Sequence, residues 1–115
     1  MLRIDIEQSD GVCLVRFQGP MTAGLDPAFL RQKTGEIKRH AADGVVADLA
    51  GVPAIGSTGI GMLVSLYASA KTAGSRLVIA APQDRVRHVL EFTRVASIIP
   101  LTPDVPSAIA TCKAE

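Results

Sequence analysis

The sequence predicts a single α/β domain with a mixed central sheet of about five strands and about four helices, in the order β-β-α-β-α-β-α-β-α. Three observations lead to this fold class. A segment with period-2 alternation opens the chain at 2–7, a segment rich in β-branched and aromatic residues follows at 12–18, and two short apolar runs come later, at 45–49 and 76–80. Amphipathic helical segments separate or follow these runs. With 115 residues the chain can bury a core without metal or disulfide staples, and we expect residues 1–115 to form one domain.

The charge and cysteine content exclude several classes of function. Lys and Arg total 12 against 11 for Asp and Glu, and the charges are scattered, so no basic patch for nucleic acid or anionic lipid is expected. Cys13 and Cys112 have no CxxC or Cys/His spacing, and His40 and His88 are the only histidines, so no metal site is expected. The sequence also has no signal peptide and no apolar run of about 20 residues. We therefore expect a cytoplasmic protein with no membrane segment.

The first two strands are predicted to pair as a hairpin. Leu2–Glu7 alternates apolar and charged residues, and Val12–Gln18 is rich in β-branched and aromatic side chains. The turn residues Ser9-Asp10-Gly11 lie between them.

A helix is predicted from Pro27 to about Ala41. Asp26 is the expected N-cap, Pro27 occupies the first helical position, and Leu25 is expected to pack on Leu30.

A parallel crossover is predicted in the middle of the chain. Val45–Leu49 and Arg76–Ala80 are short, apolar runs separated by a helix, so the two strands should be parallel neighbours. Asp48 has two interpretations. Its carboxylate orders the following loop by accepting hydrogen bonds from nearby N–H groups, or it helps to shape a pocket at Ser57.

The helix of this crossover begins near Ser57 and ends near Gly74, a plausible C-terminal cap. Met62, Ser65 and Ser69 are expected on its solvent face, where an exposed methionine beside small residues indicates a contact surface. The predicted core face is Ile60, Leu63, Val64, Tyr67 and Ala70, widened by Leu66 and Ala73.

The last third of the chain is predicted to contain two helices and one short strand. The first helix covers Gln83–Phe92, with Val86, Val89 and Leu90 facing inward, and Ser97–Ile99 is the predicted strand. Thr102-Pro103 opens the last helix, whose core face is Val105, Ala108, Ile109 and Cys112.

The turn into the helix at Ser57 is the most informative stretch. A strand-to-helix turn exposes backbone N–H groups and the positive end of the helix dipole, so a hydroxyl there is exposed and close to an anion-binding position. Considered by itself, Ser57 is a helix N-cap that stabilises the helix by about 1 kcal/mol. Gly59 and Gly61 indicate either close packing of the helix on the sheet or close approach of another chain.

The run Val45–Leu49, a short loop, and then Gly56-Ser57-Thr58-Gly59-Ile60-Gly61 at the start of a helix resembles the STAS domain of bacterial anti-sigma factor antagonists. The resemblance implies that Ser57 is a phosphoacceptor, with Thr58 as the fallback. It also implies two partners, an anti-sigma factor serine kinase of the histidine-kinase-like ATPase type and a serine phosphatase. The unphosphorylated antagonist would bind the kinase and release the sigma factor, and phosphorylation would break that complex. The expected contact surface is Gly56, Ser57, Thr58, Gly59, Met62, Ser65 and Ser69.

The sequence departs from the family pattern at one position. The family usually has Asp directly before the acceptor serine, and this chain has Gly56. This implies a different kinase, or a protein that is no longer phosphorylated and binds constitutively. The alternative functions are a stressosome-like scaffold subunit and the STAS accessory subunit of a lipid-transport ABC complex. An antagonist should be a monomer or weak dimer.

An enzymatic function is not expected. The nucleophile elbow G-x-S-x-G is absent because Ile55 stands two residues before Ser57, and neither histidine has an acidic partner nearby in the sequence that would suggest a triad. The phosphate-binding patterns G-x-x-x-x-G-K-[ST] and G-x-G-x-x-G are absent too, so no nucleotide cofactor is expected.

Overall fold

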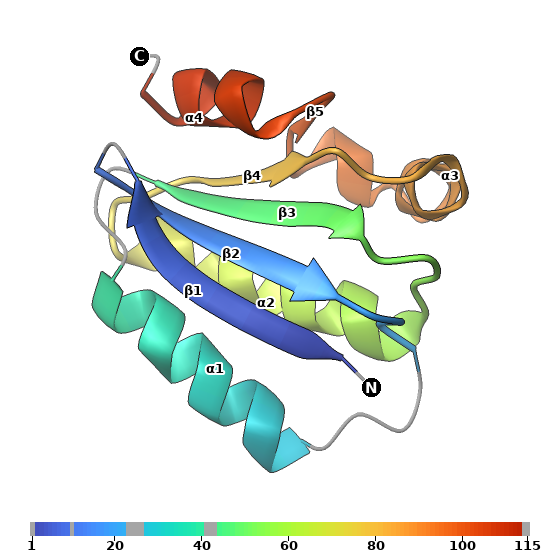
Figure 1. The fold of residues 1–115 in the computed structure, drawn as a ribbon, viewed down its shortest axis with the longest axis horizontal. Coiled ribbons are helices and arrows are strands. Elements are labelled where there is room, and N and C mark those ends of the chain that lie inside the picture. The colour runs from blue at the N-terminus through green and yellow to red at the C-terminus, as the bar shows by residue number, and fades with distance from the viewer. Residues whose placement is uncertain (1, 10, 23–26, 41–43, 114–115) are drawn as a thin grey trace.

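The computed structural model describes residues 2–9, 11–22, 27–40 and 44–113. Within these residues a five-stranded sheet has the order β1-β2-β3-β4-β5 (Figure 1). The first pair, β1 with β2, is antiparallel, and the other three pairs are parallel. The strands are β1 (Arg3–Ser9), β2 (Val12–Gln18), β3 (Val45–Gly51), β4 (Leu77–Ala80) and β5 (Leu101–Thr102), and the helices are α1 (Pro27–His40), α2 (Ser57–Thr72), α3 (Asp84–Phe92) and α4 (Val105–Lys113).

This arrangement confirms the predicted fold class, the opening hairpin and the parallel crossover from β3 through α2 to β4. The helix expected from Pro27 begins at that residue. Its predicted N-cap Asp26, the contact of Leu25 and the end at Ala41 lie outside the described residues.

Helices cover both faces of the sheet, and each face has its own core (Figure 1). On the side of α1 and α2, strand residues such as Val15, Phe17 and Leu49 pack with Leu63 and Leu66 of α2. On the other side, a smaller cluster that includes Val46 and Val78 packs against Ala108 and Cys112 of α4. Both cysteines are buried, as free thiols.

The prediction of a strand at Ser97–Ile99 is wrong. A 3-10 helix, η1 (Val95–Ser97), occupies this stretch, and β5 follows as a two-residue strand. Arg94 takes a left-handed conformation with φ 67° and redirects the chain after α3. The Ile99 N–H donates to the Val95 oxygen at 2.9 Å, so the two buried residues Val95 and Ile99 have helical spacing.

The last helix begins later than predicted, at Val105 instead of Thr102-Pro103. The Ser107 N–H donates to Asp104 Oδ1 at 2.8 Å, which places the capping carboxylate directly before the helix. Hydrogen bonding from the backbone N–H and from the side chain of Ser107 lowers the pKa of the Asp104 carboxyl, because it favours the charged form. Ala108 and Cys112 are buried as predicted.

Candidate functional site

Ser57 is the first residue of α2, and Gly56 is the N-cap. Gly56 is extended, with φ −127° and ψ −167°, and its carbonyl accepts the first helical hydrogen bond from the Ile60 N–H at 2.9 Å. The interpretation of Ser57 as the N-cap is therefore wrong, since the chain becomes helical at Ser57 itself, one residue earlier than that role requires. No side chain caps the helix, and the Ser57 side chain is exposed.

The start of α2 is an open position for a negative charge. Ile60 makes the first helical bond, so the N–H groups of Ser57, Thr58 and Gly59 have no partner within the helix. The first turn carries no acidic residue. Among the described residues, therefore, the helix itself supplies neither a side-chain cap nor an acidic first-turn residue at the positive end of the dipole.

The buried face of α2 differs from the predicted one. Met62, expected on the surface, is 5% exposed, and Val64, expected in the core, is 43% exposed. The residues that are buried are Gly59, Met62, Leu63, Leu66 and Ala70. Leu63, Leu66 and Ala70 are buried as predicted, and the centre of the stripe is rotated by roughly 50° from the predicted one, toward Gly59 and Met62.

Gly59 sets this rotation. A Cβ atom there would lie 2.5 Å from the Met21 oxygen, 2.7 Å from the Met21 Cβ and 2.8 Å from Ile55 Cγ1. Gly61, by contrast, faces open space, with nothing within 4 Å of such an atom. Gly59 therefore packs against the chain itself and has no side chain to offer a partner, whereas Gly61 is open to one.

The outward face of α2 consequently begins at Ser57 and continues along the helix. Ser65 is exposed as predicted, Thr58 and Ser69 are half-buried at its border, and Met62 and Gly59 are excluded from it. Gly61, Val64 and Ala68 belong to it, although the predicted contact surface did not include them. We define the α2 outer face as Ser57, Gly61, Val64, Ser65 and Ala68, all exposed and all uncharged.

Backbone hydrogen bonds hold the corner before Ser57 in place. The Met21 N–H donates to the Ala54 oxygen at 2.9 Å, and the Gly56 N–H donates to the Met21 oxygen at 2.8 Å. Earlier in both segments, the Gly19 N–H donates to the Gly51 oxygen at 2.9 Å. The segment that follows β2 thus clamps both ends of the loop between β3 and α2.

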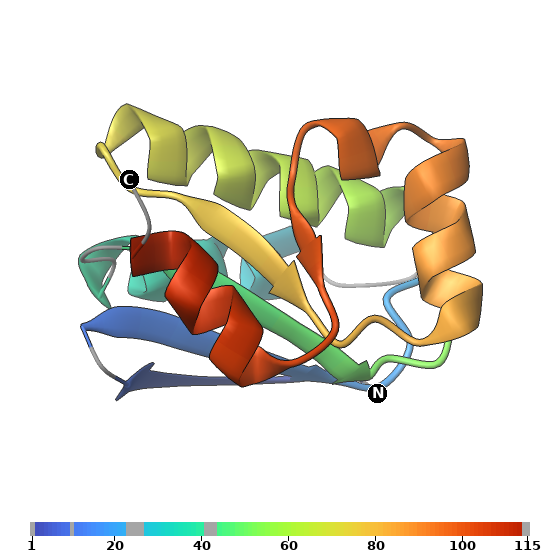
Figure 2. The same cartoon turned by 90° about the horizontal axis from the view of Figure 1, so that it is seen from above.

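Asp48 orders the same loop from the side of β3. Its Oδ1 accepts a hydrogen bond from the Ala50 N–H at 3.0 Å, which confirms the turn-forming interpretation. Its Oδ2 lies 3.7 Å from Arg16 Nε, and Gln83 Nε2, directly before α3, donates to the Ala50 oxygen at 2.8 Å. The ends of β2, β3 and β4 are therefore tied together, and Figure 2 shows α3 beside this edge of the sheet.

The described part of the chain supports neither a metal site nor a membrane-spanning helix. Among these residues no group of three or more His, Cys, Asp or Glu side chains is placed to hold a metal ion. Over the same residues, no helix combines the length and the apolar character needed to cross a membrane.

A model of the STAS domain family matches residues 3–108. The fold is similar to an anti-sigma factor antagonist from Mycobacterium paratuberculosis, with TM-score 0.86, 23% identity, and coverage of 99% of this chain and 96% of that one. It is also similar to the Bacillus cell fate determinant SpoIIAA in the phosphorylated form, with TM-score 0.69, 14% identity, and coverage of 96% and 100%. Murine Slc26a9, an anion transporter, is similar over 19% of its chain and 95% of this one, with TM-score 0.77 and 16% identity.

Proposed function

This chain belongs to the STAS domain family, and we propose that it acts as an anti-sigma factor antagonist that switches partners at Ser57. In its unphosphorylated form it binds an anti-sigma factor serine kinase of the histidine-kinase-like ATPase type. Phosphorylation of Ser57 releases the kinase, and a serine phosphatase restores binding. The observation that carries this proposal is the position of Ser57, an exposed hydroxyl at the uncapped start of α2 and on its uncharged outer face.

The same position explains how a phosphate could act without refolding the domain. A phosphoserine carries about −1.5 to −2 charges at neutral pH. The unpaired N–H groups at the start of α2 can receive these charges within the domain. A partner packed on the α2 outer face would instead have to desolvate them. A cost of about 3 kcal/mol is enough to weaken binding more than a hundredfold. That SpoIIAA has a phosphorylated form supports such a switch here.

The test uses Ser57 and its neighbour Thr58 as a matched pair of hydroxyls. Wild type, Ser57→Ala and Thr58→Ala are incubated with lysate of the source cell and ATP, and intact mass spectrometry measures the addition of a phosphoryl group. We expect Ser57→Ala to abolish the modification and Thr58→Ala to retain it. Modification that survives Ser57→Ala and disappears in Thr58→Ala would move the switch to the fallback residue.

Partner capture completes the test. Wild type and Ser57→Asp are used as bait, with Ala110→Asp as a control that puts the same charge on an exposed position of α4, on the opposite face of the sheet. We expect wild type to recover a histidine-kinase-like ATPase and Ser57→Asp to lose it. Equal recovery by wild type and Ser57→Asp would refute the switch. Recovery of scaffold subunits or a transporter ATPase would assign the chain to the alternative functions.

We propose that the residue at position 56, here Gly56, influences which kinase phosphorylates this chain. A Cβ at this position would lie 3.6 Å from the Thr22 Cα, an ordinary contact, so the aspartate usual in the family fits without strain. Gly56→Asp would also supply a capping carboxylate to α2. We expect this variant to stay folded and to change the rate of phosphorylation in the lysate assay. An unchanged rate would show that the carboxylate at this corner plays no part in kinase choice.

A further inference from the structure

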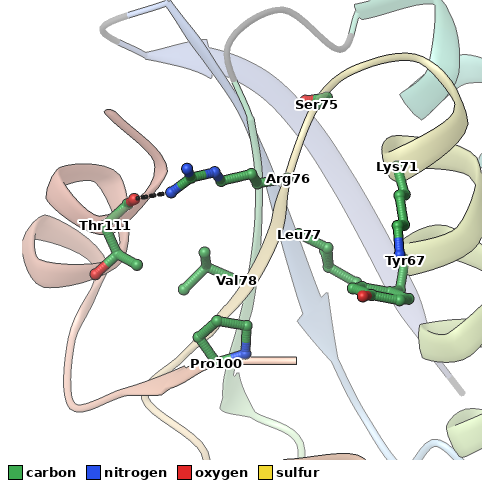
Figure 3. A pocket seen from close by; sticks show the side chains of 8 residues that line it. All are labelled: Tyr67, Lys71, Ser75, Arg76, Leu77, Val78, Pro100 and Thr111. Carbon is green, nitrogen blue, oxygen red and sulfur yellow. Dashed lines mark hydrogen bonds between the residues drawn. The ribbon is translucent and has the colours of Figure 1, made fainter. Parts of the chain in front are cut away.

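A second site candidate lies at the far end of α2 from Ser57. A cavity of about 310 Å³ opens where the last turns of α2, the start of β4 and α4 come together (Figure 3). This volume reaches the lower end of the range found for small-molecule pockets. The wall residues that matter for its chemistry are Tyr67, Lys71, Ser75, Arg76, Leu77 and Pro100.

The cavity borders a stretch of β4 that β5 leaves unpaired. β5 pairs with β4 only at Ile79 and Ala80. Because backbone groups alternate sides along a strand, the N–H and C=O of Leu77 point to the same side as those of Ile79, where Leu77 has no strand partner in the described part of the chain. The space beside Leu77 is therefore available to a bound molecule.

One wall contains a polar group that lacks a partner. Ser75 is 9% exposed, and its Oγ is a buried side-chain oxygen without a hydrogen bond among the described residues. Native proteins pair nearly all such groups, so this oxygen at the cavity wall is available to hydrogen-bond a bound molecule.

Two cations stand beside apolar surface at this cavity. Lys71 Nζ lies 6.0 Å from the centroid of the Tyr67 ring, and Arg76 Nη1 donates to the Thr111 oxygen at 3.4 Å. Neither cation forms an ion pair within the described residues, and the cavity has no acidic residue in its lining. Figure 3 shows the two cationic side chains on opposite sides of the apolar residues, Arg76 near α4 and Lys71 on α2.

We propose that this cavity binds a small organic anion. Its apolar body contacts the Tyr67 ring, Leu77 and Pro100, and its anionic group meets Lys71 on α2, while Arg76 on the α4 side adds to the positive potential of the cavity. Unpaired cations attract the charge, and the apolar walls gain from covering the body of the ligand. The site is independent of the proposed switch, because Lys71 lies 14 residues after Ser57 on α2, about 21 Å along the helix axis.

The experiment titrates the full chain with 2-naphthoate and follows the amide signals by two-dimensional NMR. The neutral control ligand is 2-naphthalenemethanol, which has a similar body without the charge. We expect saturable shifts at residues 67–78 with the carboxylate and at least tenfold weaker binding of the alcohol. The double variant Lys71→Gln, Arg76→Gln should weaken 2-naphthoate binding at least tenfold.

Two controls separate this site from general charge and folding effects. The double variant Arg3→Gln, Arg85→Gln removes two exposed cations elsewhere and should bind 2-naphthoate as wild type does. Ser75→Ala removes the unpartnered hydroxyl, so we expect it to keep or raise the melting temperature while weakening the ligand. Equal binding of the two ligands, equal binding by the Lys71, Arg76 variant, shifts confined to other elements, or no binding up to the solubility limit would each overturn the proposal.

Discussion

Replacing each of two glycines on α2 with alanine should change stability in opposite directions. Alanine in a helix is more favourable than glycine by about 0.5–1 kcal/mol. Gly61 faces open space, so Gly61→Ala should gain this amount of unfolding free energy. Gly59 has the Met21 oxygen 2.5 Å from the site of the new atom, and that oxygen is held by its hydrogen bond from the Gly56 N–H.

The crowding at Gly59 should outweigh its gain in helix propensity. Inserting a carbon into a packed site costs typically about 1–3 kcal/mol. After subtracting the propensity term, Gly59→Ala should lose up to about 2.5 kcal/mol. Because both variants gain the same propensity term, they should differ by the crowding cost alone, about 1–3 kcal/mol.

Urea unfolding followed by circular dichroism measures the difference, with the slope m compared between variants to establish that both unfold in the same way. If Gly59→Ala were as stable as Gly61→Ala, the packing of α2 on Met21 described above would be incorrect. The pair also tests the contact surface. Gly61→Ala should be more stable than wild type and yet bind the proposed kinase more weakly if the partner approaches α2 closely at this point.

Three further predictions follow from burial and hydrogen bonding. Met62→Ala should lower the unfolding free energy by about 2–5 kcal/mol, and Val64→Ala should lower it by about 0.5 kcal/mol or less. Urea unfolding measures both changes, and the reverse order would show that the rotation of α2 described above is wrong. Burial raises the pKa of the Cys112 thiol from 9.0 to about 11, with an opposing effect of Arg76, and also raises the pKa of Cys13. Both thiols should therefore resist alkylation at pH 8 until the protein is unfolded. The pKa of Cys112 is higher in the folded protein than in the unfolded chain. Its contribution to the free energy of unfolding, roughly 3 kcal/mol, is therefore complete below pH 9 and is lost as pH rises through 11. A pH series of unfolding curves would detect this loss. Asp48→Ala should cost about 1 kcal/mol through the lost hydrogen bond to the loop, and Asp48→Asn, which keeps an acceptor oxygen, should cost less.

Strand and helix positions were largely predictable because their patterns are local. Alternation in the first strand and the apolar runs at 45–49 and 76–80 each report burial directly, and the crossover rule then orders the parallel strands. The prediction of a strand at Ser97–Ile99 was wrong for the same reason, because it relied on local composition. A run ending in two isoleucines has the composition of a strand. In the structure the chain turns at Arg94, which is left-handed, and the buried residues that follow are Val95 and Ile99, four residues apart as in a helix.

The site was predicted in position but not in orientation. The hydroxyl at the start of α2 follows from the turn before it, whereas the rotation of the helix depends on a contact with Met21, which lies 38 residues before Gly59 in the sequence. A hydrophobic pattern weights Val64 heavily and gives Gly59 almost no weight, although the lack of a side chain at Gly59 is what lets the helix approach. The glycine at 59 was the available signal, because it is unfavourable in a helix unless close packing requires it.

The clamp formed by Met21 has a consequence for how this surface can diverge. It holds the loop before α2 through main-chain atoms, which every amino acid except proline at the N–H positions provides equally. The side chains of Pro53 and Ala54 take no part in those bonds, Gly56 has no side chain, and all three residues are exposed or half-buried. New recognition properties can therefore arise at this corner by ordinary substitutions, while the geometry that presents Ser57 is inherited unchanged.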